Sequence, residues 1–255
     1  MNSYHPWLLR VRPAFLASFL KQVLQIKRSV IASDHGRFFI DPASNFGHAV
    51  TSESGYEPEM VEVCTSLLQA GDTFLDIGAN EGFFSMLASK LVGDRGKVIS
   101  IEPQSRLQPI LFRNISENHA YNVRVFQVAI ADSMGMAELC LSPDMNTGSS
   151  SLVQTTRYKT PTETVPQMPL GEFLSWLDLD RIKLMKIDVE GFEYEAILGA
   201  QALFESGMIE HIALELHPTI LQKRGKPEQD ILYLLNRCGY QANPAFSTLV
   251  LSKVS

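Results

Sequence analysis

The chain has 255 residues, 45% of them hydrophobic and 20% charged, which allows one α/β domain with a substantial core and is ordinary for a soluble globular protein. Its formal net charge of −6 argues against duplex nucleic acid as the main partner, because phosphate binding requires clustered lysine and arginine. The three cysteines lie far apart and form no C-x-x-C pair, so we expect reduced thiols and a cytoplasmic location.

Residues 1–35 are predicted to form a basic helical arm. Five of the 22 basic residues precede Asp34, which is the first acidic residue. Between Trp7 and Ile31 the apolar residues recur at intervals of three and four, which indicates an amphipathic helix. We favour packing of this helix on the protein's own core or on a second copy of the chain. Peripheral attachment of residues 7–31 to an anionic membrane is the alternative.

Residues 36–255 are predicted to form one α/β domain. A short strand at 37–40 and a helix over 56–69 precede a regular alternation of strands and helices. This alternation predicts a doubly wound, mainly parallel sheet that binds ligands at the carboxyl ends of its strands, with an antiparallel edge strand near the C-terminus. Strands are expected near 73–77, 97–101, 123–130, 182–188, 209–216 and 247–253, and helices near 82–92, 105–119, 170–177, 192–204 and 227–238.

Residues 133–169 interrupt this alternation and read as an insertion. Turn-forming residues are frequent in the segment and apolar anchors are few. Met134 to Leu141 is predicted to be a strand. Residues 147–162 would either order over a cofactor as a lid or form a plain surface loop.

The first strand of the alternation leads into a predicted nucleoside pocket. The apolar run from Thr73 to Ile77, closed by Gly78, fits a buried strand that enters a tight turn and then a helix. Glycines at 78 and 82 allow the backbone to approach a ligand closely. Glu102 ends the next strand, 20 residues beyond Gly82, where a carboxylate can accept both hydrogen bonds of a ribose diol.

The spacing and charge of the turn indicate which nucleoside would bind. The NAD fingerprint G-x-G-x-x-G places a helix N-terminus on a pyrophosphate, whereas this turn reads Gly78-x-Asn80-x-Gly82. Residues 76–81 include two carboxylates and no lysine or arginine, which suits a ligand with sulfonium and ammonium groups and would repel a pyrophosphate. These features favour S-adenosylmethionine (SAM) as the cofactor and disfavour an NAD-dependent oxidoreductase.

Charged residues follow two neighbouring strands and form the candidate catalytic set. Period two places Lys186, Asp188 and Glu190 on one face, and it places Glu215 and His217 together after the next strand. Near neutral pH a histidine is well matched to accepting a hydroxyl proton, particularly beside a carboxylate. The alternatives are a purely structural ion-pair network and, less favoured, a divalent metal bound by Asp188, Glu215 and His217.

The ordered motifs resemble the FkbM-type methyltransferases, which are class I SAM-dependent enzymes that act largely on hydroxyl groups. The resemblance covers roughly residues 50–218 and is more specific as a set than any single motif. Residues before 35 have no counterpart in it. The matching motifs are Tyr56-Glu-Pro, the run from Gly71 to Gly82, Ile101-Glu-Pro103, the run from Val128 to Asp132, and the run from Lys186 to Glu193.

This resemblance implies roles for the matching positions. It places the turn after the first strand around the methionine part of SAM, Glu102 on the ribose and residues 129–132 beside the adenine, with Glu57 closing the pocket. Asp188 and His217 would lie near the acceptor hydroxyl, with Lys186 and Glu190 positioning them. The implied cofactor-binding residues are Glu57, Asp76, Gly78, Ala79, Asn80, Gly82, Glu102, Pro103, Ala129, Ile130 and Asp132.

The expected reaction is O-methylation of a saccharide or of another small-molecule, natural-product acceptor. The competing hypothesis is a SAM-binding scaffold without catalysis, attached to a membrane or partner through the N-terminal arm.

Overall fold

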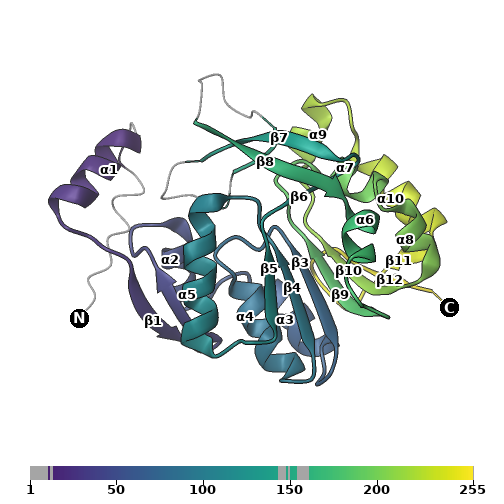
Figure 1. The fold of residues 1–255 in the computed structure, drawn as a ribbon, viewed down its shortest axis with the longest axis horizontal. Helices are drawn as coiled ribbons and strands as arrows, with labels where there is room; N and C mark the ends of the chain where they lie inside the picture. The colour runs from purple at the N-terminus through teal and green to yellow at the C-terminus, as the bar shows by residue number, and fades with distance from the viewer. Residues whose placement is uncertain (1–10, 12–13, 143–147, 149, 154–160, 255) are drawn as a thin grey trace.

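The computed structural model describes the chain except for residues 1–10, 12–13, 143–147, 149, 154–160 and 255. Over the described residues, a seven-stranded sheet forms the centre of the molecule, with strand order β11-β12-β10-β9-β3-β4-β5 (Figure 1). Its strands are β3 (Thr73–Ile77), β4 (Lys97–Ile101), β5 (Val123–Phe126), β9 (Ile182–Ile187), β10 (Ile209–Leu214), β11 (Tyr240–Ala242) and β12 (Val250–Lys253).

The sheet is mainly parallel, as the sequence predicts. Strands β5, β4, β3, β9 and β10 run parallel to one another. Strand β12 pairs antiparallel with β10, and β11 pairs antiparallel with β12, which confirms an antiparallel edge. The short edge strand β11 was not predicted, because three residues are too few to establish a period of two. Chain order reverses between β3 and β9, and such a switch point opens a crevice at the carboxyl ends of the strands.

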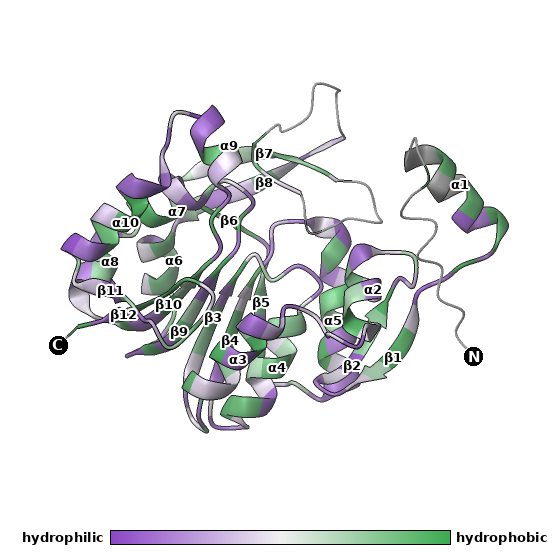
Figure 2. Cartoon of the chain, turned by 180° about the vertical axis from the view of Figure 1, so that it is seen from behind, coloured by the Kyte–Doolittle hydropathy of each residue, from purple (hydrophilic) through white to green (hydrophobic). Residues whose placement is uncertain are grey.

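Helices cover both faces of the sheet, and each face has its own hydrophobic core. Alternate residues of one strand enter different cores: Phe74 packs with the helices on one face, and Leu75 packs with those on the other. The first face carries α3 (Pro58–Leu67), α4 (Phe83–Val92) and α5 (Gln108–Asn118). The second carries α6 (Leu170–Ser175), α7 (Glu193–Leu198), α8 (Gln201–Ser206) and α10 (Glu228–Arg237). The central strands are accordingly largely hydrophobic along their length (Figure 2).

The N-terminal segment differs from the single helix that the sequence predicts. Within the described residues, α1 covers Ala14–Val23, and a hairpin of β1 (Ser29–Ser33) and β2 (Gly36–Ile40) follows. The β-branched residues Val30 and Ile31 pair with Phe39 and Phe38, so this stretch belongs to a strand and the predicted boundary at residue 35 lies in the hairpin turn. Helix α1 projects away from the central sheet (Figure 1).

The described part of the chain also contains two short α-helices that have not yet been mentioned. Helix α2 (Asn45–Thr51) was not predicted; Ser44 caps its N-terminus by accepting a hydrogen bond from the Gly47 N–H. The Lys21 ammonium pairs with the Asp41 carboxylate and so ties α1 to the residue that follows β2. Helix α9 (Pro218–Lys223) follows β10. None of the described helices combines the length and apolarity needed to cross a membrane.

A separate three-stranded sheet of order β6-β8-β7 is made of β6 (Ala129–Ala131), β7 (Gly135–Cys140) and β8 (Thr162–Pro169). The insertion contributes β7 and β8, and β6 precedes it. The predicted strand at 134–141 is confirmed as β7. The predicted strand at 123–130 is wrong in extent, because the chain leaves the central sheet after Phe126 and residues 129–131 pair with β8 instead. Much of the proposed lid at 147–162 lies outside the described residues. The predicted helix at 192–204 is divided into α7 and α8, where Gly199 packs against the carbonyl of Ala131.

Candidate active site

A cavity of about 220 Å³ lies at the carboxyl ends of β3, β4 and β9, at the switch point of the sheet. Its position is the one expected for a ligand in an open α/β sheet. The described residues of the insertion that reach it include Gly148 and Ser150 to Leu152. The sequence-predicted residues that line the cavity are Glu57, Gly78, Asn80, Glu102, Pro103, Ala129, Ile130, Asp188, Glu190 and Glu215.

Gly78 brings the end of β3 into contact with the end of β9. Its φ of +84° lies in the left-handed region, and a Cβ at this position would be 1.8 Å from the carbonyl oxygen of Asp188. Only glycine allows so close an approach of two backbones. The crevice at the switch point is therefore narrow where Gly78 and Asp188 meet.

Glu102 is fixed at the cavity wall by two backbone amides. Its Oε2 accepts a hydrogen bond from the Asn80 N–H at 2.9 Å, and its Oε1 accepts one from the Gln104 N–H at 2.9 Å. Burial raises the pKa of this carboxyl to about 7, although both amide bonds act in the opposite direction. Each oxygen has a second lone pair, so the carboxylate can still accept two hydrogen bonds from a ligand.

Four predicted cofactor-binding residues lie outside the cavity lining: Asp76, Ala79, Gly82 and Asp132. Asp76 lies beneath α4, where its Oδ2 accepts a hydrogen bond from the Ser85 hydroxyl at 2.6 Å. Gly82 is the N-cap of α4 and packs against Leu111. Asp132 is exposed and accepts a hydrogen bond from Ser133. Sequence spacing placed these residues near the crevice but could not show which way their side chains face.

Lys186 carries the positive charge closest to the carboxylates of the cavity. Its ammonium is 3.2 Å from Asp188 Oδ2 and 5.3 Å from the centre of the Phe84 ring. Burial acts to lower the pKa of Lys186, but nearby carboxylates, Asp188 first among them, outweigh burial and raise it. Lys186 therefore stays charged. It lines a small neighbouring cavity of about 40 Å³ together with Glu57 and Glu215.

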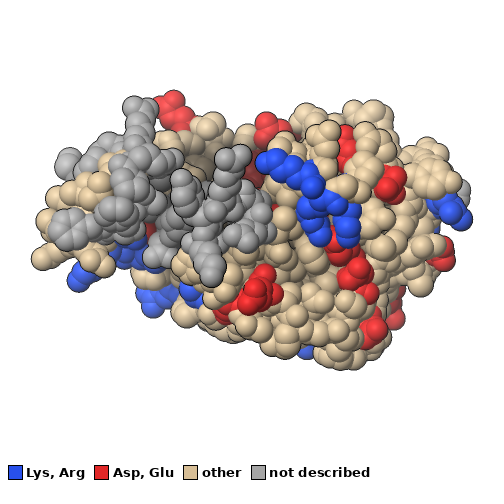
Figure 3. Space-filling model, turned by 90° about the horizontal axis from the view of Figure 1, so that it is seen from above, with Lys and Arg blue, Asp and Glu red and all other residues tan. Residues whose placement is uncertain are grey.

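The described part of the cavity wall is acidic. It includes five carboxylates and no lysine or arginine. The outer surface seen from above carries both acidic and basic side chains (Figure 3). Burial raises the pKa of Glu57, and it raises that of Glu190 to about 7. Both residues have positive φ, of 42° and 51°, and non-glycine residues held in this region cluster at functional sites. The wall thus suits ligands that are cationic or that donate hydrogen bonds.

His217 does not line the cavity, and both of its ring nitrogens contact carboxylates. Nδ1 is 2.7 Å from Glu193 Oε1, and Nε2 is 3.3 Å from Glu190 Oε2. Burial acts to lower the pKa of His217, but the hydrogen bond to Glu193 and the charge of Glu190 raise it to about 9. The imidazole is therefore protonated at neutral pH, which argues against the predicted role as a base. The imidazolium contacts Glu190 and Glu193.

Glu193 contacts His217 and was not among the sequence-predicted site residues. It is fully buried, and besides contacting His217 it accepts a hydrogen bond from the Gly191 N–H at 2.8 Å. Its place within the last matching motif was the available signal, but nothing in the motif indicated a partner 24 residues away.

A group of three potential metal ligands differs from the one considered from the sequence. Atoms of Asp188, Glu190 and His217 lie within 4.8 Å of one another, so Glu190 takes the place of Glu215. An ion here would have to displace the proton of His217 and its contact with Glu190, because the imidazolium already occupies this position.

The His217 contacts predict a specific pH dependence of stability. Because its pKa is raised above the ordinary value of 6.5, its contribution is fully present below pH 6.5 and is lost as the pH rises through about 9. The free energy of unfolding, measured with urea, should fall between pH 6 and roughly pH 9 in the wild type. It should fall less in His217→Gln. His48→Gln, at an exposed position, serves as the control and should keep the wild-type slope. An identical slope in all three proteins would contradict this charge assignment.

The doubly wound, mainly parallel sheet with a cavity at its switch point is the Rossmann-like fold of the class I methyltransferases, whose methyl donor is SAM. The chain belongs to the FkbM methyltransferase family, because the model of the methyltransferase FkbM domain matches residues 76–242, more than half of the chain. The matched region contains the cavity-lining residues from Ile77 to Glu215, but not Tyr56, Glu57 or the N-terminal hairpin.

Three individual proteins are similar to this chain. Methyltransferase sdnD of Sordaria araneosa is 27% identical over 161 residues, which are 52% of this chain and 61% of that protein. A candidate rRNA methylase from Clostridium thermocellum has a similar fold, with a TM-score of 0.51 and 10% identity over 78% of this chain and 95% of that one. The FkbM methyltransferase from Methylobacillus flagellatus KT is also similar, with a TM-score of 0.46 and 16% identity over 74% of this chain and 45% of that one.

Proposed function

We propose that the protein transfers the methyl group of SAM to a hydroxyl of an uncharged small molecule, such as a saccharide or another polyhydroxylated natural product. The observation that carries this proposal is the acidic wall at the switch point, where the described lining residues include carboxylates and no basic side chain. Such a wall favours a cationic cofactor and an acceptor that donates hydrogen bonds, and it disfavours phosphorylated acceptors.

The residues present fit the cofactor. We propose that Glu102 accepts hydrogen bonds from the ribose diol, since two amides hold its carboxylate at the cavity wall. The turn at Gly78 and Asn80 would hold the methionine part. Ala129 and Ile130 offer an apolar surface to the adenine, because both side chains are buried and line the cavity.

Asp188 is the group best placed to receive the acceptor's proton. Its Oδ2 contacts the Lys186 ammonium, whereas its Oδ1 is buried and has no hydrogen-bond partner within the described part of the chain. A buried acceptor atom of this kind is costly unless a ligand satisfies it. SAM supplies an electrophilic methyl group, and Asp188 Oδ1 would orient the hydroxyl and take its proton. Glu190, held by His217, would accept a further hydrogen bond from the acceptor.

The test is a screen of acceptors with SAM, followed by mass spectrometry for the gain of one methyl group. The panel should pair neutral glycosides and polyols with their phosphorylated counterparts. We expect the neutral acceptors to gain one methyl group. We expect no gain when the reactive hydroxyl of such an acceptor is replaced by hydrogen. Methylation only at nitrogen or carbon atoms, or only of phosphorylated acceptors, would contradict the proposal. The family assignment does not favour the alternative of a non-catalytic scaffold.

A further inference from the structure

We propose that Arg28, in the segment before the matched family domain, is a positioning residue for the SAM site. It acts through Glu81, which belongs to the turn that joins β3 to α4. This inference rests on SAM being the cofactor and is independent of the acceptor.

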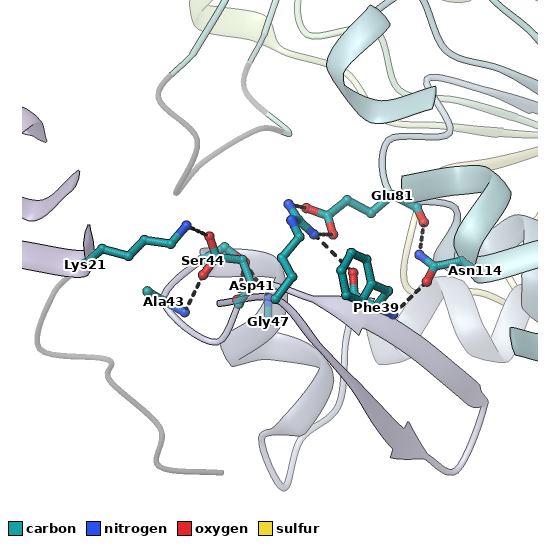
Figure 4. A network of polar contacts seen from close by, with 9 residues as sticks. Lys21, Phe39, Asp41, Ala43, Ser44, Gly47, Glu81 and Asn114 are labelled. Carbon is teal, nitrogen blue, oxygen red and sulfur yellow. Dashed lines mark hydrogen bonds and ion pairs between the residues drawn. The ribbon is translucent and has the colours of Figure 1, made fainter. Parts of the chain in front are cut away.

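A bidentate ion pair joins Arg28 to Glu81 (Figure 4). Arg28 Nη1 is 2.7 Å from Glu81 Oε2, and Nη2 is 2.9 Å from Oε1. The Glu81 side chain is fully buried and that of Arg28 is 19% exposed. Arg28 Nη1 also donates to the Phe39 carbonyl at 3.1 Å, so the guanidinium is itself held by the hairpin. Paired planar groups of this kind fix orientation as well as charge.

A second connection holds the backbone of the same residue. Asn114 on α5 donates from Nδ2 to the Glu81 carbonyl at 2.7 Å, and its Oδ1 accepts from the Phe39 N–H at 2.7 Å (Figure 4). Asn114 is fully buried. The side chain and the carbonyl of Glu81 are therefore both tied to strand β2, one through Arg28 and the other through Asn114.

These connections matter because Glu81 lies between two residues that shape the cofactor site. Asn80 lines the cavity with a φ of 50° and donates its N–H to Glu102, and Gly82 is the left-handed N-cap of α4. Glu81 itself is not among the lining residues. Its charge is compensated by Arg28.

Loss of Arg28 would leave a buried carboxylate without its guanidinium partner. A buried charge that loses its partner is strongly destabilising, and the turn can relieve this by moving Glu81 toward water. Such a movement would shift the Asn80 N–H away from Glu102 and open the wall on which the ribose and the methionine part would rest. The N-terminal hairpin thus takes part in cofactor binding without touching the cofactor.

The test measures the dissociation constant of S-adenosylhomocysteine (SAH) by calorimetry on the full chain, at a temperature at which each variant is folded. We expect Arg28→Met to weaken binding by at least about tenfold and Arg28→Lys to weaken it less, since lysine keeps the charge but not the bidentate geometry. Arg37→Met is the matched control. It removes an arginine–glutamate pair of the same hairpin, with Glu117 on α5 at 3.3 Å, that does not involve the turn, and it should bind SAH like the wild type.

The double variant Arg28→Met/Glu81→Met separates positioning from stability, because it removes both charges and keeps apolar bulk. We expect its Tm to recover relative to Arg28→Met. Its SAH affinity should recover only in part, because the charge that would move Glu81 is gone but the bidentate contact that fixes the turn is not replaced. Wild-type SAH affinity in the folded single variant, or in the double variant, would overturn the proposal. If the single variant does not fold, the double variant alone decides.

Discussion

Replacing Asp188 by asparagine is expected to lower kcat by about 10²- to 10⁴-fold, the range typical for loss of a group that accepts a proton in the transition state. Asparagine has the same shape but cannot take the proton of a hydroxyl. SAH affinity should change little, because the contact with the cofactor turn is made by the Asp188 carbonyl, which packs on Gly78 and is retained.

This prediction is checked by measuring kcat and the SAH dissociation constant on the same preparations, with an acceptor identified in the screen. Asp180→Asn is the matched control, since Asp180 is exposed before β9 and outside the cavity, and it should keep the wild-type kcat. Full turnover in Asp188→Asn would remove Asp188 from the proposed chemistry. An equal loss of kcat and SAH affinity would assign it to cofactor binding instead.

Replacing Glu102 by glutamine is expected to weaken SAH binding by roughly 30- to 150-fold, or about 2 to 3 kcal/mol, the range for hydrogen bonds to a charged group. Glutamine would also direct its NH₂ group at one of the two backbone N–H groups that now bind the carboxylate. Calorimetry provides the measurement. Glu138→Gln, exposed on β7, is the control that should bind normally.

The same carboxylate predicts a pH dependence of binding. Its pKa of about 7 lies above the ordinary 4.5, so its protonated form contributes stability below pH 4.5 that is lost as the pH rises through about 7. Hydrogen bonds from a ribose favour the ionised form, so binding has the opposite trend. SAH affinity should fall as the pH is lowered below about 7 in the wild type, and this part of the dependence should be missing in Glu102→Gln. An unchanged pH profile in the variant would contradict the assignment of Glu102 to the ribose.

The parallel core of the fold could be predicted because its signals are local. Apolar runs closed by Gly78 and Glu102 mark the carboxyl ends of adjacent strands, and parallel pairing brings such ends to one edge. The same argument predicted that Asp188 and Glu215 would lie at this edge, and both line the cavity. In the N-terminal hairpin, the predicted strand at 37–40 is confirmed as β2. Strand β1 was missed, because the apolar residues near Ile31 fit a helical period as well as a strand.

Contacts between residues distant in sequence could not be predicted. Arg28 and Glu81 are 53 residues apart, and no local pattern indicates that one neutralises the other. His217 carries the residue type of a general base, but its contacts with Glu190 and Glu193 keep it protonated. Side-chain direction and protonation depend on tertiary packing, which residue type and spacing do not encode.

The most direct test of the central claim is a crystal structure of the protein with SAH. We predict the ribose hydroxyls on the Glu102 carboxylate, the sulfur in the crevice where Gly78 meets Asp188, and the Asp188 carboxylate facing the space beside the sulfur. SAH bound elsewhere, or in this cavity with its ribose away from Glu102, would contradict the account.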